Sequence, residues 1–167
     1  MVKHEKLKDL EQIISDYQDS MFKFAFFRTG SLADSEDIVQ NVFLKMYENK
    51  IDLSTVVNIK SYLFKSISNK CLNYRRREKV IKVIPLEAAE NKTDDDKTSD
   101  IIQEYERIKK LFDLIPEEQA EVIQMRTIDG LAFTEISEIL EIPITTVKSR
   151  FKYGVDKIKS KINNRRF

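Results

Sequence analysis

The segment from residue 131 to residue 161 constrains the fold most, because it has the pattern of two helices joined by a tight turn. The first helix is expected at Phe133–Leu140, and the connection Glu141-Ile142-Pro143 is as short as a helix-turn-helix requires. In the second helix, five apolar residues lie within about 80° of one another and form a stripe that suits burial. They are Val147, Phe151, Val155, Ile158 and Ile162.

The opposite side of the second helix is polar and basic. Such a helix suits a DNA major groove, because hydroxyls and amines can meet base edges while flanking cations meet phosphates. The outward and flanking residues are Thr145, Thr146, Lys148, Ser149, Arg150, Lys152 and Tyr153. We expect this surface to contact duplex DNA. An ordinary helical hairpin with a solvated basic side is the alternative.

The overall charge is nearly balanced, with 29 basic and 28 acidic residues, so its distribution is more informative than its sum. Residues 60–82 hold eight basic residues and one acidic residue, and residues 148–167 again hold eight and one. Two separated basic segments indicate two contacts with nucleic acid, unless both are only solvated helix surfaces.

Cysteine and histidine are nearly absent. Cys71 is the one cysteine and His4 the one histidine, which argues against a disulfide, a metal site or histidine-based catalysis. No apolar run approaches the roughly 18 residues of a membrane span, and the start of the chain is too polar for a secretory signal. We therefore expect a soluble cytoplasmic protein with no cofactor, no metal and no membrane insertion. No phosphate loop or nucleophile–base pair indicates an enzyme.

Helical spacing and the scarcity of glycine and proline, three of each, predict an all-α fold. Ser31 and Asp34 fit an amino-terminal helix cap. The helices expected in the amino-terminal half cover about Glu5–Thr29, Ser31–Glu48 and Ile59–Lys79.

A polar segment separates the two halves of the chain. Residues 91–100 contain no apolar residue and three consecutive aspartates, so they lack the groups that would stabilise an ordered structure. Helical spacing resumes near Ile101. We expect two small helical domains, residues 1–84 and 105–167, joined by a flexible acidic linker over residues 85–104, with the helix-turn-helix in the second domain.

The second helix combines a buried side with one apolar residue on the outside. Its inward residues are Ile38, Val39, Val42, Phe43 and Met46. Leu44 lies opposite, between Asp37 and Gln40, and an apolar residue among polar ones is suited to contact a protein partner. A single exposed leucine without a function is the alternative.

The third helix has an outward side of cations, amides and an aromatic residue. Its buried stripe contains Leu63, Ile67, Cys71 and Tyr74. The outward residues are Tyr62, Lys65, Asn69, Asn73 and Arg76. Such a surface suits bases and phosphates, and an exposed aromatic can stack on an unpaired base. A merely solvated polar side is the alternative.

Several motifs in fixed order carry a resemblance to a known family. They are Asp34-x-Glu36-Asp37-Ile38-Val39-Gln40-x-Val42-Phe43, Tyr62-Leu63 followed by Asn69 and Arg75-Arg76-Arg77, Leu111-x-x-Leu114-Ile115-Pro116, Thr134-Glu135-Ile136-Ser137-Glu138-x-Leu140, and Thr146-Val147-Lys148-Ser149-Arg150. Their order and spacing resemble a bacterial RNA polymerase sigma factor of the extracytoplasmic-function (ECF) group, from about Tyr17 to Ile162.

The resemblance implies a role for each surface. The helix with Asp37, Gln40 and Leu44 would dock on the β′ clamp of core RNA polymerase, and the helix-turn-helix domain would contact the β flap. The helix with Tyr62 would engage the minus-ten promoter element as it melts, with the loop 49–58 holding a flipped base. The final helix would contact the minus-thirty-five element. The resemblance also implies an anti-sigma partner, and a monomer is expected when the factor is free. Gly154 departs from a commonly basic position, at a helix-propensity cost of about 1 kcal/mol.

A stand-alone helix-turn-helix transcriptional regulator is the alternative function. It would explain the carboxyl-terminal half, but it leaves the outward sides of the second and third helices without a role. A helical adaptor that binds only protein would need no basic surfaces.

Overall fold

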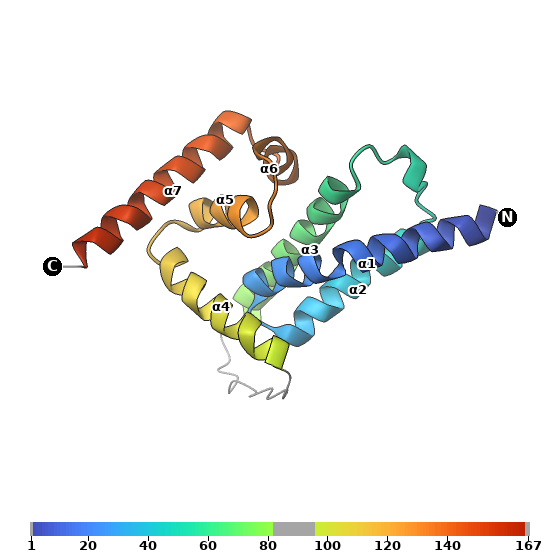
Figure 1. Cartoon of the computed structure of the whole chain (residues 1–167), viewed down its shortest axis with the longest axis horizontal. Helices are drawn as coiled ribbons and strands as arrows, with labels where there is room; N and C mark the ends of the chain where they lie inside the picture. The colour runs from blue at the N-terminus through green and yellow to red at the C-terminus, as the bar shows by residue number, and fades with distance from the viewer. Residues whose placement is uncertain (1, 82–95, 166–167) are drawn as a thin grey trace. The chain divides into compact units, whose positions relative to one another are not determined.

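The computed structural model describes residues 2–81 and 96–165, and their regular structure is entirely helical. This confirms the expected all-α class for the described residues. The elements in chain order are α1 (Val2–Thr29), α2 (Leu32–Glu48), the short 3-10 helix η1 (Leu53–Thr55), α3 (Ile59–Ile81), α4 (Asp96–Phe112), α5 (Glu117–Thr127), α6 (Phe133–Leu140) and α7 (Ile144–Asn164) (Figure 1). They divide into two compact units, Met1–Glu87 and Ala88–Phe167, each described by itself below.

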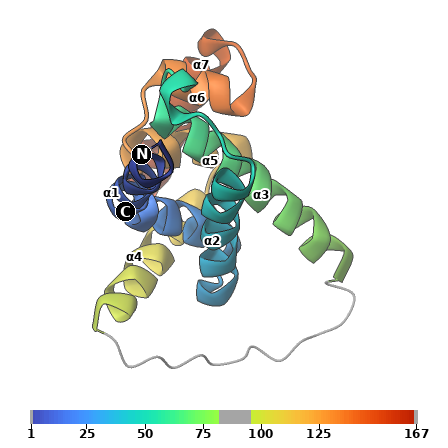
Figure 2. The ribbon, with the colours of Figure 1, turned by 90° about the vertical axis from the view of Figure 1, so that its right-hand side faces the viewer.

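The first unit is built from α1, α2 and α3, which pack on one another in all three pairs. In Figures 1 and 2, α2 runs back alongside α1, and the loop after α2 leads through η1 into α3. At the centre of the unit the rings of Phe24 in α1 and Phe64 in α3 meet edge to face, with their centroids 5.2 Å apart. The buried apolar residues around them include Met21, Ile38, Val39, Val42, Phe43, Met46, Leu63, Ile67 and Cys71. The buried sides expected for α2 and α3 are therefore correct, except that Tyr74 is only half-buried.

The turn between α1 and α2 is closed by hydroxyl groups. Gly30 has φ +67°, the left-handed conformation that favours glycine, and Ser31 is the amino-terminal cap of α2. The Ser31 hydroxyl accepts a hydrogen bond from the Asp34 backbone N–H at 3.2 Å, which confirms the predicted cap. The buried Ser35 hydroxyl donates to the Ser31 carbonyl at 2.6 Å and lies 2.8 Å from the Thr29 hydroxyl.

A side-chain hydrogen bond joins α3 to the start of α2. The Tyr74 hydroxyl donates to Oδ2 of Asp34 at 2.9 Å. Burial, this hydrogen bond and the charges of Asp34 and Glu78 raise the pKa of Tyr74 well above its usual range. The folded unit therefore retains the phenol proton.

In the second unit, α7 packs on α5 and α6, and α5 packs on α6. The rings of Phe133 and Phe151 meet edge to face with centroids 5.4 Å apart. The bounds predicted for α6 are correct, and Glu141 ends this helix in the left-handed conformation at φ +55°. The buried residues include Ile115, Val122, Ile123, Met125, Leu131, Ile136, Ile139 and Val147.

Two expectations for the second unit are wrong. The linker expected over residues 85–104 is helical from Asp96 onward, and its residues 82–95 lie outside the described part of the chain. Helical hydrogen bonds join each residue to the fourth one before it, so a helix that contains Ile101 also orders the preceding turn. Ile162, expected in the buried stripe of α7, is 37% exposed. The reason is length, because α7 has 21 residues while α5 has 11 and α6 has 8, so its last turns have no helix of matching length beside them.

A glycine sets how closely α7 approaches α5. Gly154 is buried, and a Cβ atom added to it would lie 2.7 Å from Cδ1 of Ile123 and 3.1 Å from Cβ of Gln119. Because carbon atoms pack at about 3.5 Å or more, no larger residue fits there without movement of α5. The glycine that departs from the family pattern therefore has a packing role in this chain.

We predict that Tyr74→Phe lowers the free energy of unfolding by about 1 kcal/mol at neutral pH, through loss of the hydrogen bond to Asp34. Since the pKa of Tyr74 is raised on folding, its contribution is fully present below the unfolded phenol's pKa of about 10 and is lost as the pH rises above that value. Urea unfolding at a series of pH values should show the two proteins converging above about pH 10. Tyr47→Phe, at an exposed tyrosine, is the control. Parallel pH curves for Tyr74→Phe and the natural protein would contradict this account.

We predict that Gly154→Ala destabilises the second unit by about 1–2 kcal/mol, because the added methyl group overpacks the contact with α5. On an unobstructed helix the same change would stabilise by up to about 1 kcal/mol. Ser160→Ala, on the exposed side of α7, should be neutral or slightly stabilising. Thermal unfolding followed by circular dichroism checks the sign, and a gain of stability for Gly154→Ala would show that α5 gives way.

Candidate protein- and nucleic-acid-binding surfaces

The outward side of α2 carries an apolar pair among polar residues. Asp37, Gln40 and Leu44 are all exposed, and Leu44 exposes 52% of its surface. One turn further, Tyr47 is 61% exposed, a residue that the sequence analysis missed although it stands three residues from Leu44. We call Asp37, Gln40, Leu44 and Tyr47 the α2 strip. Because Val42 and Phe43 hold the helix on its other side, the strip is free of any role in the core.

The outward side of α3 is polar and basic, as expected. Lys65, Asn69, Asn73 and Arg76 are exposed. Tyr62 differs from the expectation, because it is half-buried rather than exposed. It lies in the first turn of the helix, beside the chain that leads into α3. We call these five residues the α3 surface.

The loop between α2 and α3 is held by side-chain hydrogen bonds. A carboxylate oxygen of Asp52 accepts from the backbone N–H of Ser54 at 3.1 Å and from its hydroxyl at 2.6 Å. Oδ1 of Asn58 accepts from the Ser61 N–H at 3.1 Å, which caps the start of α3. Between these two fixed points, Val57 is fully exposed. An exposed apolar residue on a hydrogen-bonded loop was not foreseen from the sequence.

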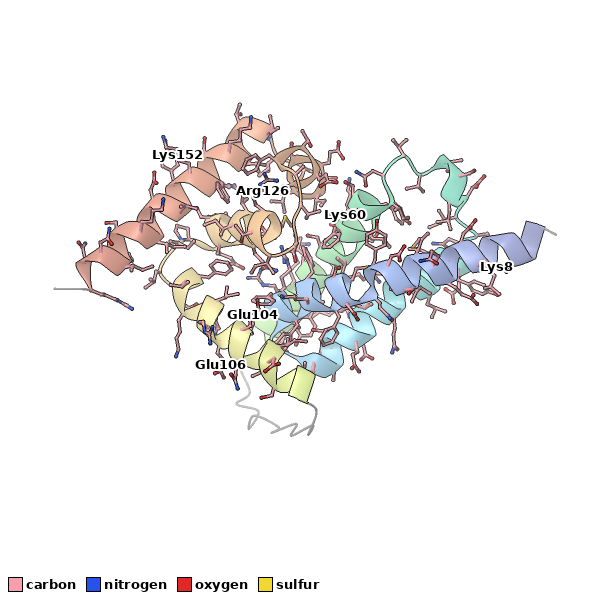
Figure 3. All side chains as sticks on the ribbon, in the orientation of Figure 1. Lys8, Lys60, Glu104, Glu106, Arg126 and Lys152 are labelled. Carbon is pink, nitrogen blue, oxygen red and sulfur yellow. The ribbon has the colours of Figure 1, made fainter. Side chains whose placement is uncertain are left out.

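The residues predicted to contact DNA on α7 lie on its outward side or at its edges. We call this set the α7 surface. Its exposed members are Thr145, Lys148, Ser149, Lys152 and Tyr153, and its half-buried members are Thr146 and Arg150. Figure 3 shows Lys152 pointing away from α5 and α6.

The Ser149 hydroxyl donates a hydrogen bond to the Thr145 carbonyl at 2.9 Å, within α7. Its hydrogen is therefore engaged inside the helix, whereas its oxygen lone pairs face outward and can accept.

Two short turns hold α6 and α7 in place. Nη1 of Arg126 donates to the Leu131 carbonyl at 3.1 Å, and its guanidinium lies 4.8 Å from the centre of the Phe133 ring (Figure 3). After α6, the Ser137 hydroxyl donates to the Ile142 carbonyl at 2.6 Å. These contacts fix the start of α7 without a side-chain cap, since Pro143 occupies the cap position.

The structure therefore brings the predicted residues together in three groups. The α2 strip and the α3 surface belong to the first unit, and the α7 surface belongs to the second. Within residues 2–81 and 96–165, no helix combines the length and the apolar character needed to cross a membrane.

Family models match both units. Sigma-70 region 2 matches residues 13–80, and sigma-70 region 4 matches residues 105–158. The α2 strip and the α3 surface fall inside the first match, and the α7 surface falls inside the second.

Relatives of established name match over most of their length. The chain is 24% identical over 164 residues to the ECF RNA polymerase sigma factor SigW of Bacillus subtilis, which covers 91% of this chain and 88% of the relative. It is 28% identical over 169 residues to the ECF RNA polymerase sigma-E factor of Haemophilus influenzae, with 93% and 88% covered.

Solved structures share the fold at low sequence identity. CnrH, in complex with the cytosolic domain of CnrY, has a TM-score of 0.69 and 16% identity, covering 95% of this chain and 90% of its own. The sigma factor RpoE of Bartonella quintana, in complex with the anti-sigma factor NepR, has a TM-score of 0.68 and 19% identity, with 93% and 98% covered. With both sigma-70 regions present in order and ECF relatives matched along almost the whole chain, this protein belongs to the ECF group of RNA polymerase sigma factors.

Proposed function

We propose that this alternative sigma factor uses three separate surfaces to direct RNA polymerase to its promoters. The α2 strip binds the β′ clamp, the α3 surface engages the minus-ten element, and the α7 surface contacts the minus-thirty-five element. The family membership makes the chain a transcription initiation factor rather than an enzyme, so the catalysis belongs to the polymerase.

The α2 strip has the composition of a protein-binding surface. Leu44 and Tyr47 offer apolar area at its centre, while Asp37 and Gln40 supply polar groups at its rim. Buried aromatic and apolar contacts surrounded by polar ones carry most of the binding energy in protein interfaces. Since none of the four residues is buried in the free protein, docking can cover them without disturbing the core.

The α3 surface and the neighbouring loop suit DNA whose strands have separated. Lys65 and Arg76 supply positive charge, and the amides of Asn69 and Asn73 can pair with the edges of exposed bases. Unpaired bases stack on aromatic rings, and apolar side chains inserted between bases favour unstacking. We assign the first role to the accessible part of Tyr62 and the second to Val57.

The exposed α3 surface is the observation that carries the proposal. Leu63, Ile67 and Cys71 are completely buried on one side of α3, so its cations and amides on the other side have no part in the core. A regulator that bound only duplex DNA through α7 would have no use for this second surface.

The α7 surface has the groups needed for a duplex. The outward oxygen of Ser149 can accept from a base amine, and Lys152 beside it can donate to a base carbonyl or N7. Lys148 and Arg150 stand at the edges of the surface, where phosphates lie when a helix enters the major groove. The same unit also contacts the polymerase β flap.

The domains follow the same division. We propose a region 2-like domain over residues 1–84 and a region 4-like domain over residues 105–167, joined by the segment 85–104. The region 2 and region 4 matches, which lie inside these bounds, support the division. From Asp96 the connecting segment is helical.

We also infer an anti-sigma partner and a cytoplasmic location. Two solved relatives were determined as complexes, CnrH with the cytosolic domain of CnrY and RpoE with the anti-sigma factor NepR. A factor that binds polymerase and DNA must work in the same compartment as both.

We predict that the protein opens promoter DNA only together with core polymerase. Thymines around the minus-ten element should become reactive to permanganate with the holoenzyme, but not with the free protein. Tyr62→Ala combined with Asn69→Ala should reduce this reactivity at least about fivefold, because each lost stacking contact is worth about 1–3 kcal/mol. The double variant should still bind core polymerase and still protect the minus-thirty-five element.

Gln18→Ala, at an exposed amide of α1, is the matched control and should open DNA as the natural protein does. Tight and specific duplex binding by the free protein, with no melting in the presence of core polymerase, would contradict the proposal and favour a stand-alone regulator.

A further inference from the structure

Three cations gather where α2 and α3 meet, outside the surfaces described above. Lys70 of α3 lies within hydrogen-bonding reach of Lys45 of α2, and Arg77 acts on Lys70 through its charge. Lys45 and Arg77 are exposed, and Lys70 is half-buried. We call these residues the seam cations.

The fold holds the seam cations in this arrangement. Lys70, Tyr74 and Arg77 follow one another at spacings of four and three residues, so they lie on the same side of α3. The central member, Tyr74, is bonded to Asp34 of α2. Because that hydrogen bond fixes one helix against the other, Lys70 and Arg77 flank a point that cannot shift freely.

The carboxylates at the seam are directed to Tyr74 rather than to the cations. Asp34 accepts the hydrogen bond from Tyr74, and Glu78 also acts on the Tyr74 hydroxyl. The pKa of Lys70 is lowered by its hydrogen bond with Lys45, by burial and by the charges of Lys45 and Arg77, with no acidic group among these causes. Like charges held together in this way repel one another, and an anion placed between them would remove the repulsion.

The seam cations border the α3 surface. On a helical projection of α3, Arg77 lies about 40° and Lys70 about 60° from Asn73, the member of the α3 surface nearest to them. Lys45 stands next to Leu44 in the chain, at the side of α2 that turns toward α3. A DNA strand lying on the α3 surface would therefore have its backbone within reach of these cations.

We propose that Lys45, Lys70 and Arg77 bind a backbone phosphate of the promoter strand that lies along the α3 surface. This inference rests on the proposed function, since it requires that α3 engages DNA. A phosphate suits the site because it carries negative charge on several oxygens, which can accept from two ammonium groups and a guanidinium at the same time. The contact is independent of base identity, so it would position the strand while the α3 surface contacts the bases.

The test uses the holoenzyme and promoter DNA with a preopened minus-ten region. Single phosphates of each strand are replaced in turn by neutral methylphosphonates, and the affinity of each DNA is measured. For the natural protein, at least one substitution next to the minus-ten element should weaken binding. With Lys45→Gln combined with Lys70→Gln, that same substitution should have no further effect, because the contact is already absent. The slope of log affinity against log salt should also fall by about 0.7–0.9.

Lys8→Gln combined with Lys109→Gln is the control, since both lysines are exposed on other helices. It should keep the natural methylphosphonate profile. Thermal unfolding of the seam variant should show undiminished stability, because the substitutions remove a repulsion.

Three results would overturn the inference. The first is an unchanged methylphosphonate profile and salt slope in the seam variant. The second is weaker binding to core polymerase with an unchanged DNA profile, which would assign the cations to an acidic protein surface. The third is equal binding of inorganic phosphate by the free protein with no effect on DNA, which would indicate a free anion. Failure of the natural holoenzyme to bind preopened DNA at all would instead contradict the proposed function.

Discussion

The packing of α2 and α3 onto α1 determines which residues of the first unit remain available for partners. The rings of Phe24 and Phe64 meet at its centre, and the apolar sides of α2 and α3 close around them. Each of these helices has one buried side, so its other side carries no responsibility for the fold. The same pattern that stabilises the unit therefore leaves the α2 strip and the α3 surface outside, next to one another.

The second unit depends on close packing of a different kind. Gly154 lets α7 approach α5 without the space that a side chain would need, and Phe133 against Phe151 fixes α6 on the other part of the helix. A helix held in two places keeps its outward side in a constant orientation. In that arrangement, Ser149 and Lys152 share one direction, as a helix entering a groove requires.

Much of this architecture follows from spacing in the sequence. The bounds of α6, the cap at Ser31 and the buried sides of α2 and α3 were predicted correctly, because amphipathic helices carry a period that sequence alone displays. The helix α5 was not predicted as a separate element. Its residues 122–125 are buried one after another, so it has no polar side and no visible period.

What the sequence does not contain is the contact between elements. The half-burial of Tyr62 and the approach of Lys45 to Lys70 depend on which helices become neighbours. Gly154 likewise shows only a cost in helix propensity until its contact with Ile123 is known. The roles of the exposed residues on α2, α3 and α7 depend in turn on partners outside the chain.

The central claim is that three surfaces of one chain meet three different partners at the same time. A photoreactive amino acid placed singly at Gln40, Asn69 or Ser149, all of them exposed, tests this claim in the holoenzyme on promoter DNA. We predict crosslinks to the polymerase β′ clamp from position 40, to the minus-ten strand from position 69 and to upstream duplex from position 149. A crosslink from position 40 to DNA, or crosslinks from position 69 to polymerase alone, would contradict the assignment.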